Sequence, residues 1–223
     1  MKRYFMVILL AMSLTVPPLQ ARTNRKSQIW MSEKFSGKLT PQVAVFGQIE
    51  HRYSNDNDAL AAQHSIIGMN YNVNKWFSIT PFLRTVNYQS GKTGTKNDWY
   101  LEYRPSLDIG FKWTLFNFKF NLRHRIERRI YKSSDNAWRF RERIEIKTGP
   151  KWTRFQFQPY LADDIFYQKN KDGFYQNWFI LGLDFTPIKP LTAGIFYMLQ
   201  TDQTKDKTIT QTDIWTAKFN FEL

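Results

Sequence analysis

The sequence has 223 residues, a formal net charge of +13, no cysteine and a 17% share of aromatic residues. The lack of cysteine excludes a disulfide scaffold, a thiolate metal site, a catalytic cysteine and a cysteine-linked lipid anchor. A mean hydropathy of -0.52 without an apolar run of about 18 residues excludes a bundle of membrane-spanning helices, and 8 Trp, 11 Tyr and 19 Phe exclude a disordered basic tail.

The first 21 residues carry the pattern of a secretory signal peptide. Lys2 and Arg3 supply a charged start, Tyr4 to Val16 forms an apolar core, and Ala21 is a small residue at the expected cleavage site. The apolar core is too short to span a bilayer as a helix. We therefore expect residues 1–21 to be removed on export and residues 22–223 to form the exported domain.

From Gln28 onward, apolar and polar residues alternate with a period of two. In the stretch from Phe116 to Tyr131, apolar side chains fall on one face and charged or amide side chains on the other. The stretches from Trp99 to Trp113 and from Trp215 to Leu223 repeat this pattern, which a helical period does not fit. The alternation predicts strand segments at 28–36, 42–54, 62–73, 76–90, 98–112, 116–131, 137–149, 153–168, 174–187, 191–203 and 209–223.

Short turns and longer polar loops alternate between these segments. The short turns are expected at 37–38, 74–75, 112–116, 150–151 and 188–189, and the longer loops at 54–59, 90–97, 132–136, 169–173 and 201–208. Such alternation is typical of a bacterial outer-membrane barrel with short periplasmic turns. The two aromatic girdles of such a barrel are expected beside the short turns, at Trp76, Trp113 and Trp152, and near the long loops, at Trp99, Trp138, Tyr53 and Tyr167.

We therefore predict an all-β fold, in which residues 22–223 form an antiparallel up-and-down transmembrane β-barrel of 10 to 12 strands. A soluble lipocalin-like barrel is the alternative, but its core would be unusually aromatic and its outer face would carry long ladders of charge. Eleven segments conflict with the even strand number of bacterial single-chain barrels, and ten fits the chain length best. Glu142 and Asp163 fall on the predicted lipid face, where an uncompensated charge is costly.

Four stretches of sequence carry a resemblance to a known family. They are Gln48–Tyr53, Arg139–Arg143, Gln158–Leu161 and the closing stretch Trp215–Leu223. Over nearly all of the predicted barrel, the chain resembles an uncharacterised domain-of-unknown-function family of outer-membrane β-barrel proteins of Gram-negative bacteria. The resemblance implies location and fold, and it supplies no activity and no catalytic residue. The closing stretch also resembles the signal read by the barrel-insertion machinery.

The polar face of the predicted strands carries an excess of arginine. Counting back from the hairpin loops places Glu127 opposite Arg141 and brings Arg84 within reach of Glu102. The remaining excess suits a narrow, salt-bridged lumen that passes or binds small anions. An occluded structural or adhesive barrel, filled by the same ion pairs, is the alternative. The candidate lumen residues are Glu50, Arg52, Arg84, Glu102, Arg104, Arg123, Arg125, Glu127, Arg141, Arg143 and Glu145.

A lipid-modifying outer-membrane enzyme is a further alternative. It needs a positioned histidine at the lipid edge, and His51 and His64 are the candidates because they bracket the loop at 54–59. The period of two places these histidines on opposite faces, and no spacing resembles a catalytic triad.

No cofactor and no metal site are predicted. The run Asn55–Asp58 offers oxygen ligands for Ca²⁺ but lacks the later glycine and glutamate of a helix-loop-helix site. We expect it to form a solvated loop or to contact lipopolysaccharide through bridging cations. The expected partners are outer-membrane lipid and lipopolysaccharide, the barrel-insertion machinery and small anions. Nucleic acid is not expected, because the positive charge is spread over alternating strand positions.

Overall fold

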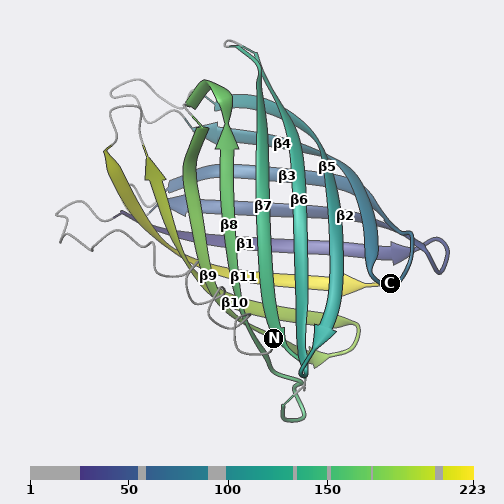
Figure 1. Ribbon diagram of the computed structural model, residues 1–223. Coiled ribbons are helices and arrows are strands. Elements are labelled where there is room, and N and C mark those ends of the chain that lie inside the picture. The colour runs from purple at the N-terminus through teal and green to yellow at the C-terminus, as the bar shows by residue number, and fades with distance from the viewer. Residues whose placement is uncertain are drawn as a thin grey trace, which may run out of the picture.

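The computed structural model describes residues 26–54, 59–89, 99–132, 135–149, 152–171, 173–203 and 208–223, so the predicted signal peptide lies outside the described residues. The described residues form one closed barrel (Figure 1). Its strands are β1 (Lys26–Lys38), β2 (Val43–Ser54), β3 (Ala59–Asn72), β4 (Phe77–Gln89), β5 (Trp99–Leu115), β6 (Phe118–Tyr131), β7 (Ala137–Thr148), β8 (Gln158–Gln168), β9 (Gly173–Ile188), β10 (Leu191–Gln203) and β11 (Ile209–Glu222), with one short 3-10 helix, η1 (Lys169–Lys171). Within the described ranges, no helix is long and apolar enough to cross a membrane.

The barrel closes through a parallel pair of strands. β1 and β11 run in the same direction, from the pair Lys26 and Thr212 to the pair Ser36 and Glu222. Every other neighbouring pair is antiparallel. An odd number of up-and-down strands requires one parallel contact to close. The predicted range of 10 to 12 strands is therefore confirmed at eleven, and the preference for ten, which assumed antiparallel closure, is wrong.

Local chemistry defines the short turns at one end of the barrel. Asn74 Oδ1 accepts a hydrogen bond of 2.8 Å from the backbone N–H of Trp76, which caps the turn between β3 and β4. Phe116 and Asn117 both have positive φ, 48° and 63°, the geometry of a two-residue hairpin turn whose twist matches its strands. Because this turn consists of two residues only, β5 continues to Leu115, into the turn predicted at 112–116.

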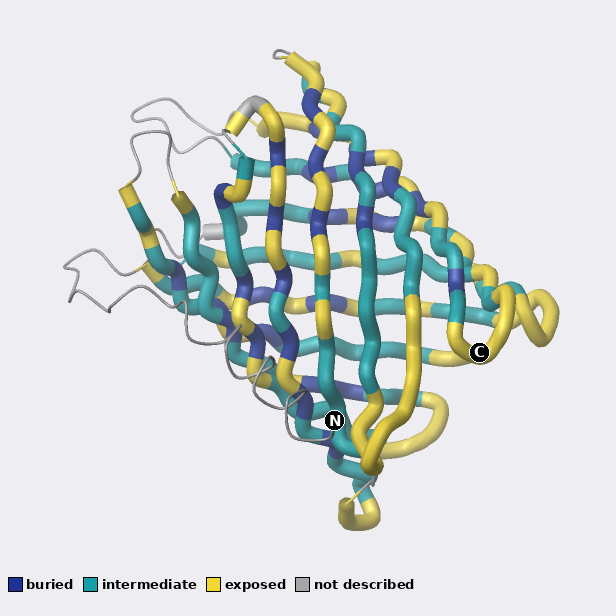
Figure 2. The backbone as a smooth tube through the Cα atoms, viewed as in Figure 1, coloured by how far each residue is buried: buried dark blue, intermediate teal, exposed yellow. Residues whose placement is uncertain are grey.

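Side chains alternate between the two faces of the barrel wall. In β8 the even positions from Gln158 to Gln168 are buried, whereas Leu161 and Ile165 are exposed. Figure 2 shows this alternation as blue and yellow bands along the front strands. The inward face of each strand is therefore fixed by its period of two.

One side of the interior is apolar, and we call it the apolar wall. Trp30 of β1 meets Trp178 of β9 edge to face, with ring centroids 5.6 Å apart, and Phe166 of β8 packs on Trp178 at 4.6 Å. A Cβ on Gly182 would collide with the ring of Tyr160, so glycine is needed for that ring to cross the interior. The wall consists of Trp30, Tyr160, Ala162, Phe166, Tyr175, Trp178, Ile180, Met198 and Ile214.

Candidate functional site

The opposite side of the interior is charged, and we call it the charged wall. It comprises the inward arginines and acids of β2 and β4–β7 together with Asp164 of β8. All the candidate lumen residues lie on inward positions of these strands and are buried or half-buried: Glu50, Arg52, Arg84, Glu102, Arg104, Arg123, Arg125, Glu127, Arg141, Arg143 and Glu145.

Asp164 is the centre of the charged wall. Its carboxylate is 0% exposed and accepts a bidentate pair of hydrogen bonds from Arg141, at 3.0 Å and 2.7 Å. Arg123 and Arg143 donate to the same carboxylate at 3.1 Å and 3.3 Å. One buried carboxylate thus holds three guanidinium groups from two neighbouring strands, and the cluster is net positive.

Two further buried carboxylates organise the loop end of the charged wall. Glu102 accepts hydrogen bonds from Arg104 Nε at 2.8 Å and from Arg129 Nε at 2.6 Å. Glu127 forms an ion pair with Arg139 across the β6–β7 hairpin. Neither carboxylate is measurably exposed, so their charges are balanced by these arginines rather than by solvent.

The predicted partners of two candidate residues are wrong. The register of β6 and β7 places Glu127 opposite Arg139 instead of Arg141. The register of β4 and β5 places Arg84 opposite Arg104, and Glu102 is engaged elsewhere. Both errors shift the partner by two residues. Such a shift keeps every side chain on its face, which is why the inward positions were right and the pairs were not.

The two walls meet through arginines that lie over aromatic rings. The Arg141 guanidinium lies 4.4 Å from the ring centroid of Trp178 and 4.6 Å from that of Phe166. Arg52 lies 3.5 Å from the ring centroid of Trp30. The face of an aromatic ring attracts a cation electrostatically, so these contacts are favourable. They fill the middle of the interior, where the charged and apolar walls touch.

Two cavities remain on either side of this filled layer. The loop-end chamber, about 900 Å³, lies toward the long loops, and the turn-end chamber, about 530 Å³, lies toward the short turns. Arg84 lines both. The charged residues of the loop-end chamber are Arg52, Arg84, Glu102, Arg104, Arg129, Arg139, Lys171 and Asp202. Those of the turn-end chamber are Lys34, Arg84, Asp108, Lys112, Arg123, Arg125 and Glu222.

Both chambers are therefore basic, and several of their cations lack an acid partner. Arg125 forms an ion pair with Asp108, with 2.6 Å between Arg125 Nε and Asp108 Oδ1. In contrast, Lys34 and Lys112 form no ion pair with any acid in the part of the chain that the structure describes. A cavity lined by unbalanced positive charge raises the local concentration of anions.

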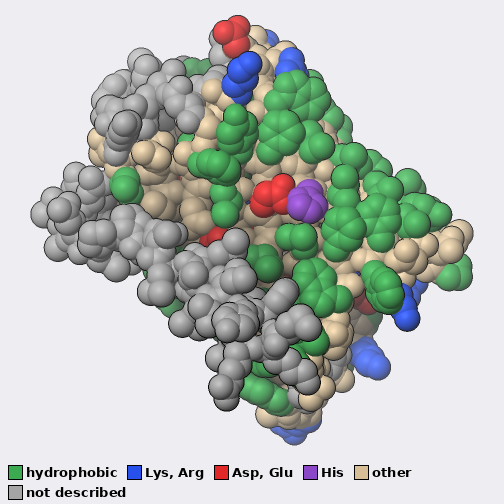
Figure 3. Space-filling model, in the orientation of Figure 1, with side chains coloured by type: hydrophobic (Ala, Val, Ile, Leu, Met, Phe, Trp, Pro, Cys, Tyr) green, Lys and Arg blue, Asp and Glu red, His purple; other side chains and the backbone are tan. Residues whose placement is uncertain are grey.

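Two acidic residues on the outward face have polar partners. Glu142 and Asp163 lie on that face as predicted, Glu142 paired with His124 Nδ1 and Asp163 accepting a hydrogen bond of 2.9 Å from Asn177. Figure 3 shows an acidic and a histidine side chain side by side among hydrophobic ones over β6 and β7. Glu142 and Asp163 thus each have a polar partner on a neighbouring strand.

The structure does not bring His51 and His64 together. His64 points into the interior, is 2% exposed and has its Nδ1 3.4 Å from Glu50 Oε1. His51 lies on the outward face, with its Nε2 3.4 Å from Gln63 Nε2. The predicted opposite faces are therefore observed, and no serine lies within hydrogen-bond distance of either ring among the contacts of the described residues.

No group of three or more histidine, aspartate or glutamate side chains suited to a metal ion occurs among the described residues. The run Asn55–Asp58 lies outside them.

Sequence reasoning missed the apolar wall. In β9 the stretch from Trp178 to Leu183 has no polar side chain on either face, so its inward residues Trp178 and Ile180 cannot be separated from outward Phe179 and Leu181 by period alone. A strand that faces a charged interior alternates apolar and polar residues. The loss of this alternation in β8–β10 was therefore the signal from which the apolar wall could have been predicted.

Comparison with known proteins places the chain in a family. Residues 27–211 match the profile of a family described as "Protein of unknown function (DUF2490)". The chain belongs to this family. The match covers nearly the whole barrel, which agrees with the resemblance found in the sequence. No curated protein and no solved structure gives a significant match.

Proposed function

We propose that this DUF2490 protein is an outer-membrane β-barrel of a Gram-negative bacterium, with a narrow pathway that prefers small anions. The observation that carries the proposal is that apolar side chains cover the outside of the barrel while charged side chains lie inside it, the reverse of a soluble protein. Ile67, Leu181 and Ile195 point outward and are 69%, 54% and 56% exposed, while buried arginines and acids line the interior. A soluble barrel hides its apolar face inside, whereas a barrel in lipid turns it outward.

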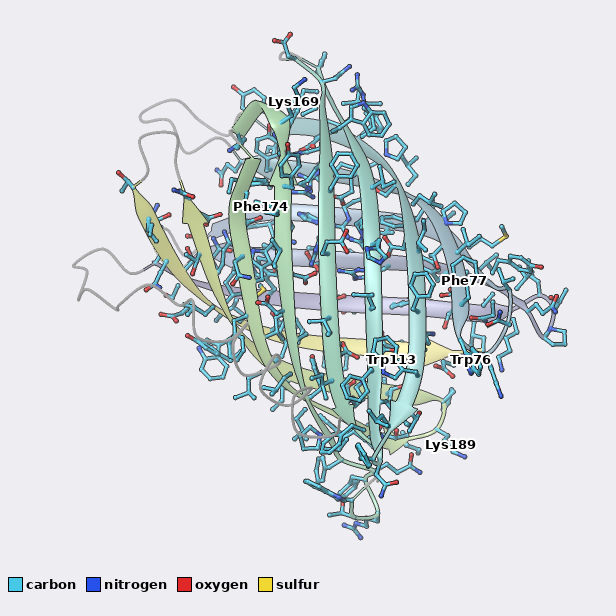
Figure 4. All side chains as sticks on the ribbon, viewed as in Figure 1. Trp76, Phe77, Trp113, Lys169, Phe174 and Lys189 are labelled. Carbon is cyan, nitrogen blue, oxygen red and sulfur yellow. The ribbon has the colours of Figure 1, made fainter. Side chains whose placement is uncertain are left out.

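The rims of the barrel support this location. Trp76, Phe77 and Trp113 lie near the short turns, and Phe174 lies toward the opposite end (Figure 4). Trp76 and Phe174 are 62% and 68% exposed. Large exposed aromatic side chains at both ends suit the two lipid–water boundaries of a bilayer. Export through the predicted signal peptide at 1–21 would bring the chain to the outer membrane.

Lipid and the insertion machinery are the partners that follow from this location. The outward face would contact outer-membrane lipid and, at the long-loop rim, lipopolysaccharide. β11 carries Trp215, Phe219 and Phe221 in one phase on the outward face, as expected of a closing strand that barrel-insertion machinery recognises.

The preference for anions rests on the charges of the two chambers. The turn-end chamber presents Lys34 and Lys112, which form no ion pair with an acid of the described residues, and its five cations outnumber its two acids, Asp108 and Glu222. The loop-end chamber is lined by five arginines against Glu102 and Asp202. The pathway is narrow because the chambers are separate cavities that share Arg84.

Conductance of the refolded protein in a planar bilayer under a salt gradient tests the proposal. We expect small openings whose reversal potential is anion-selective. The double variant K34Q/K112Q should shift the potential toward neutrality, because it removes positive charge from the turn-end chamber. The control is Arg128→Gln, since Arg128 lies on the outward face over Trp138. A cation-selective potential would contradict the proposal.

The occluded structural or adhesive barrel is the second candidate. It is favoured by the filled layer in which Arg141, Asp164 and Trp178 join the two walls. The absence of openings from protein that is demonstrably folded in the same bilayers would select this candidate. The lipid-modifying enzyme has no comparable support, since His51 and His64 lie on opposite faces of the barrel wall.

A further inference from the structure

Arg84 is a buried cation without an acid partner. Its side chain is 9% exposed, and Nε has no hydrogen-bond partner in the described part of the barrel. No acid among the described residues forms an ion pair with it. A buried charge left unpaired strongly destabilises most proteins, so this position calls for an explanation.

The surroundings of Arg84 are positive. Arg104 lies directly opposite it on β5, and Arg125 shares the ring of Phe82 with it. The acids that act on Arg84 from a distance are Glu127 and Glu50. Glu127 is held by Arg139 and Glu50 by Arg52. An anion entering from either chamber would therefore meet an arginine that is free to bind it.

The loop-end chamber next to Arg84 is suited to a hydroxylated molecule. Aromatic rings of Trp30, Tyr88 and Trp178 line it, together with amide side chains such as those of Gln176 and Gln200. Gln176 and Gln200 each donate a hydrogen bond of 2.6 Å to Asp202, so this acid is engaged and does not compete for the arginines. Aromatic surface beside amide and carboxylate groups is the usual lining of a site for a polar ring.

We propose that Arg84, supported by Arg104, binds the carboxylate or phosphate of a sugar acid or sugar phosphate whose body occupies the loop-end chamber. The inference deepens the proposed function and rests on the basic interior that it describes. Arginine suits both anions because its planar guanidinium donates two parallel hydrogen bonds to either. Binding of this kind supplies the missing partner of Arg84 and explains why an unpaired arginine stands between the two chambers.

Isothermal titration calorimetry on the refolded protein in detergent micelles tests this site. The probes are glucuronate, glucose 6-phosphate, inorganic phosphate and neutral glucose. We expect one or both anionic sugars to bind, each more tightly than inorganic phosphate, and glucose not to bind. The choice between glucuronate and glucose 6-phosphate tells which anionic group the site prefers.

The variant Arg84→Gln should weaken binding about tenfold or more, because the charge-assisted hydrogen bonds are lost. Its unfolding temperature without ligand should not fall, since the variant removes an unpaired buried charge. Arg84→Lys keeps the charge without the paired donors and should bind with intermediate affinity, which provides a second test if the glutamine variant fails to fold. Arg128→Gln, on the outward face, should bind as the native protein does.

The inference is overturned if neither anionic sugar binds, if Arg84→Gln binds unchanged, or if inorganic phosphate or glucose binds as tightly as the sugars. Its failure is distinguishable from failure of the proposed function. A barrel that conducts anions and binds no sugar overturns only the site. A barrel that binds the sugar in micelles but shows no openings in a bilayer overturns only the pathway.

Discussion

The apolar wall and the charged wall face each other across one interior, yet different forces hold them. In the apolar wall, Trp178 touches Trp30 and Phe166, and contacts of this type depend on burial and packing rather than on direction. In the charged wall, Asp164 holds three arginines through hydrogen bonds of defined length and angle. The apolar wall should therefore tolerate changes of shape, and the charged wall should not tolerate loss of a partner.

The largest effect is expected for Asp164→Asn. The change leaves the buried Arg141 guanidinium without its ion-pair partner, whereas Arg143 keeps Glu145 and Arg123 keeps Asp108. Loss of one partner of a buried ion pair typically costs about 3 to 5 kcal/mol. Urea unfolding of the protein in lipid vesicles measures the free energy of unfolding. The matched control is Asp163→Asn, one residue away on the outward face. The new side chain keeps the oxygen that accepts the hydrogen bond from Asn177 Nδ2. Equal losses for the two variants would contradict the central role of Asp164.

A smaller effect is expected for Arg141→Lys. Lysine keeps the positive charge but loses the bidentate contact with Asp164 and the planar contact with Trp178. We expect the free energy of unfolding to fall by about 1.5 to 3 kcal/mol, the range for hydrogen bonds that involve charged groups. The same vesicle assay applies. A stability unchanged from the native protein would show that charge alone, without geometry, holds this wall.

The smallest effect is expected for Met198→Leu in the apolar wall. Met198 is 1% exposed, and a volume-conserving change in an apolar core usually costs less than about 1.5 kcal/mol. Comparing this variant with Arg141→Lys sets a conservative change in one wall against a conservative change in the other. If Met198→Leu lowered the free energy of unfolding more than Arg141→Lys does, the apolar wall would be the one that tolerates changes of shape less well.

The sequence predicted the barrel and its inward positions because a period of two is a local property. The phase of β6 alone places Arg123, Arg125 and Glu127 inward. Ion pairs between strands depend on register, which the bounds of a loop do not fix. Ala137 pairs with Arg129 rather than with Tyr131, and this offset of two residues places Glu127 opposite Arg139 instead of Arg141. Arg84 was expected within reach of Glu102, but Glu102 pairs with Arg104 and Arg129, so the lack of an acid partner at Arg84 emerged only from the structure.

The apolar wall also lay beyond sequence reasoning, and the parallel closure was signalled only by the odd number of predicted segments. Pairing of β1 with β11 joins the two ends of the barrel and leaves no mark on the alternation within either strand. In the strands of the apolar wall, both faces carry apolar residues. The period of two then cannot tell which side chains point inward. Both features are consequences of how the whole sheet closes.

The parallel contact between β1 and β11 also bears on how the chain assembles. All other strand pairs are joined through neighbours in sequence, whereas Ser36 and Phe221, which meet at this contact, are 185 residues apart. Bringing such distant segments together has a high entropic cost and is slow. Until it happens, the growing sheet has two open edges whose backbone groups can pair with any other strand. The timing of this last contact therefore decides whether a chain becomes a closed monomer or joins the edge of a second copy.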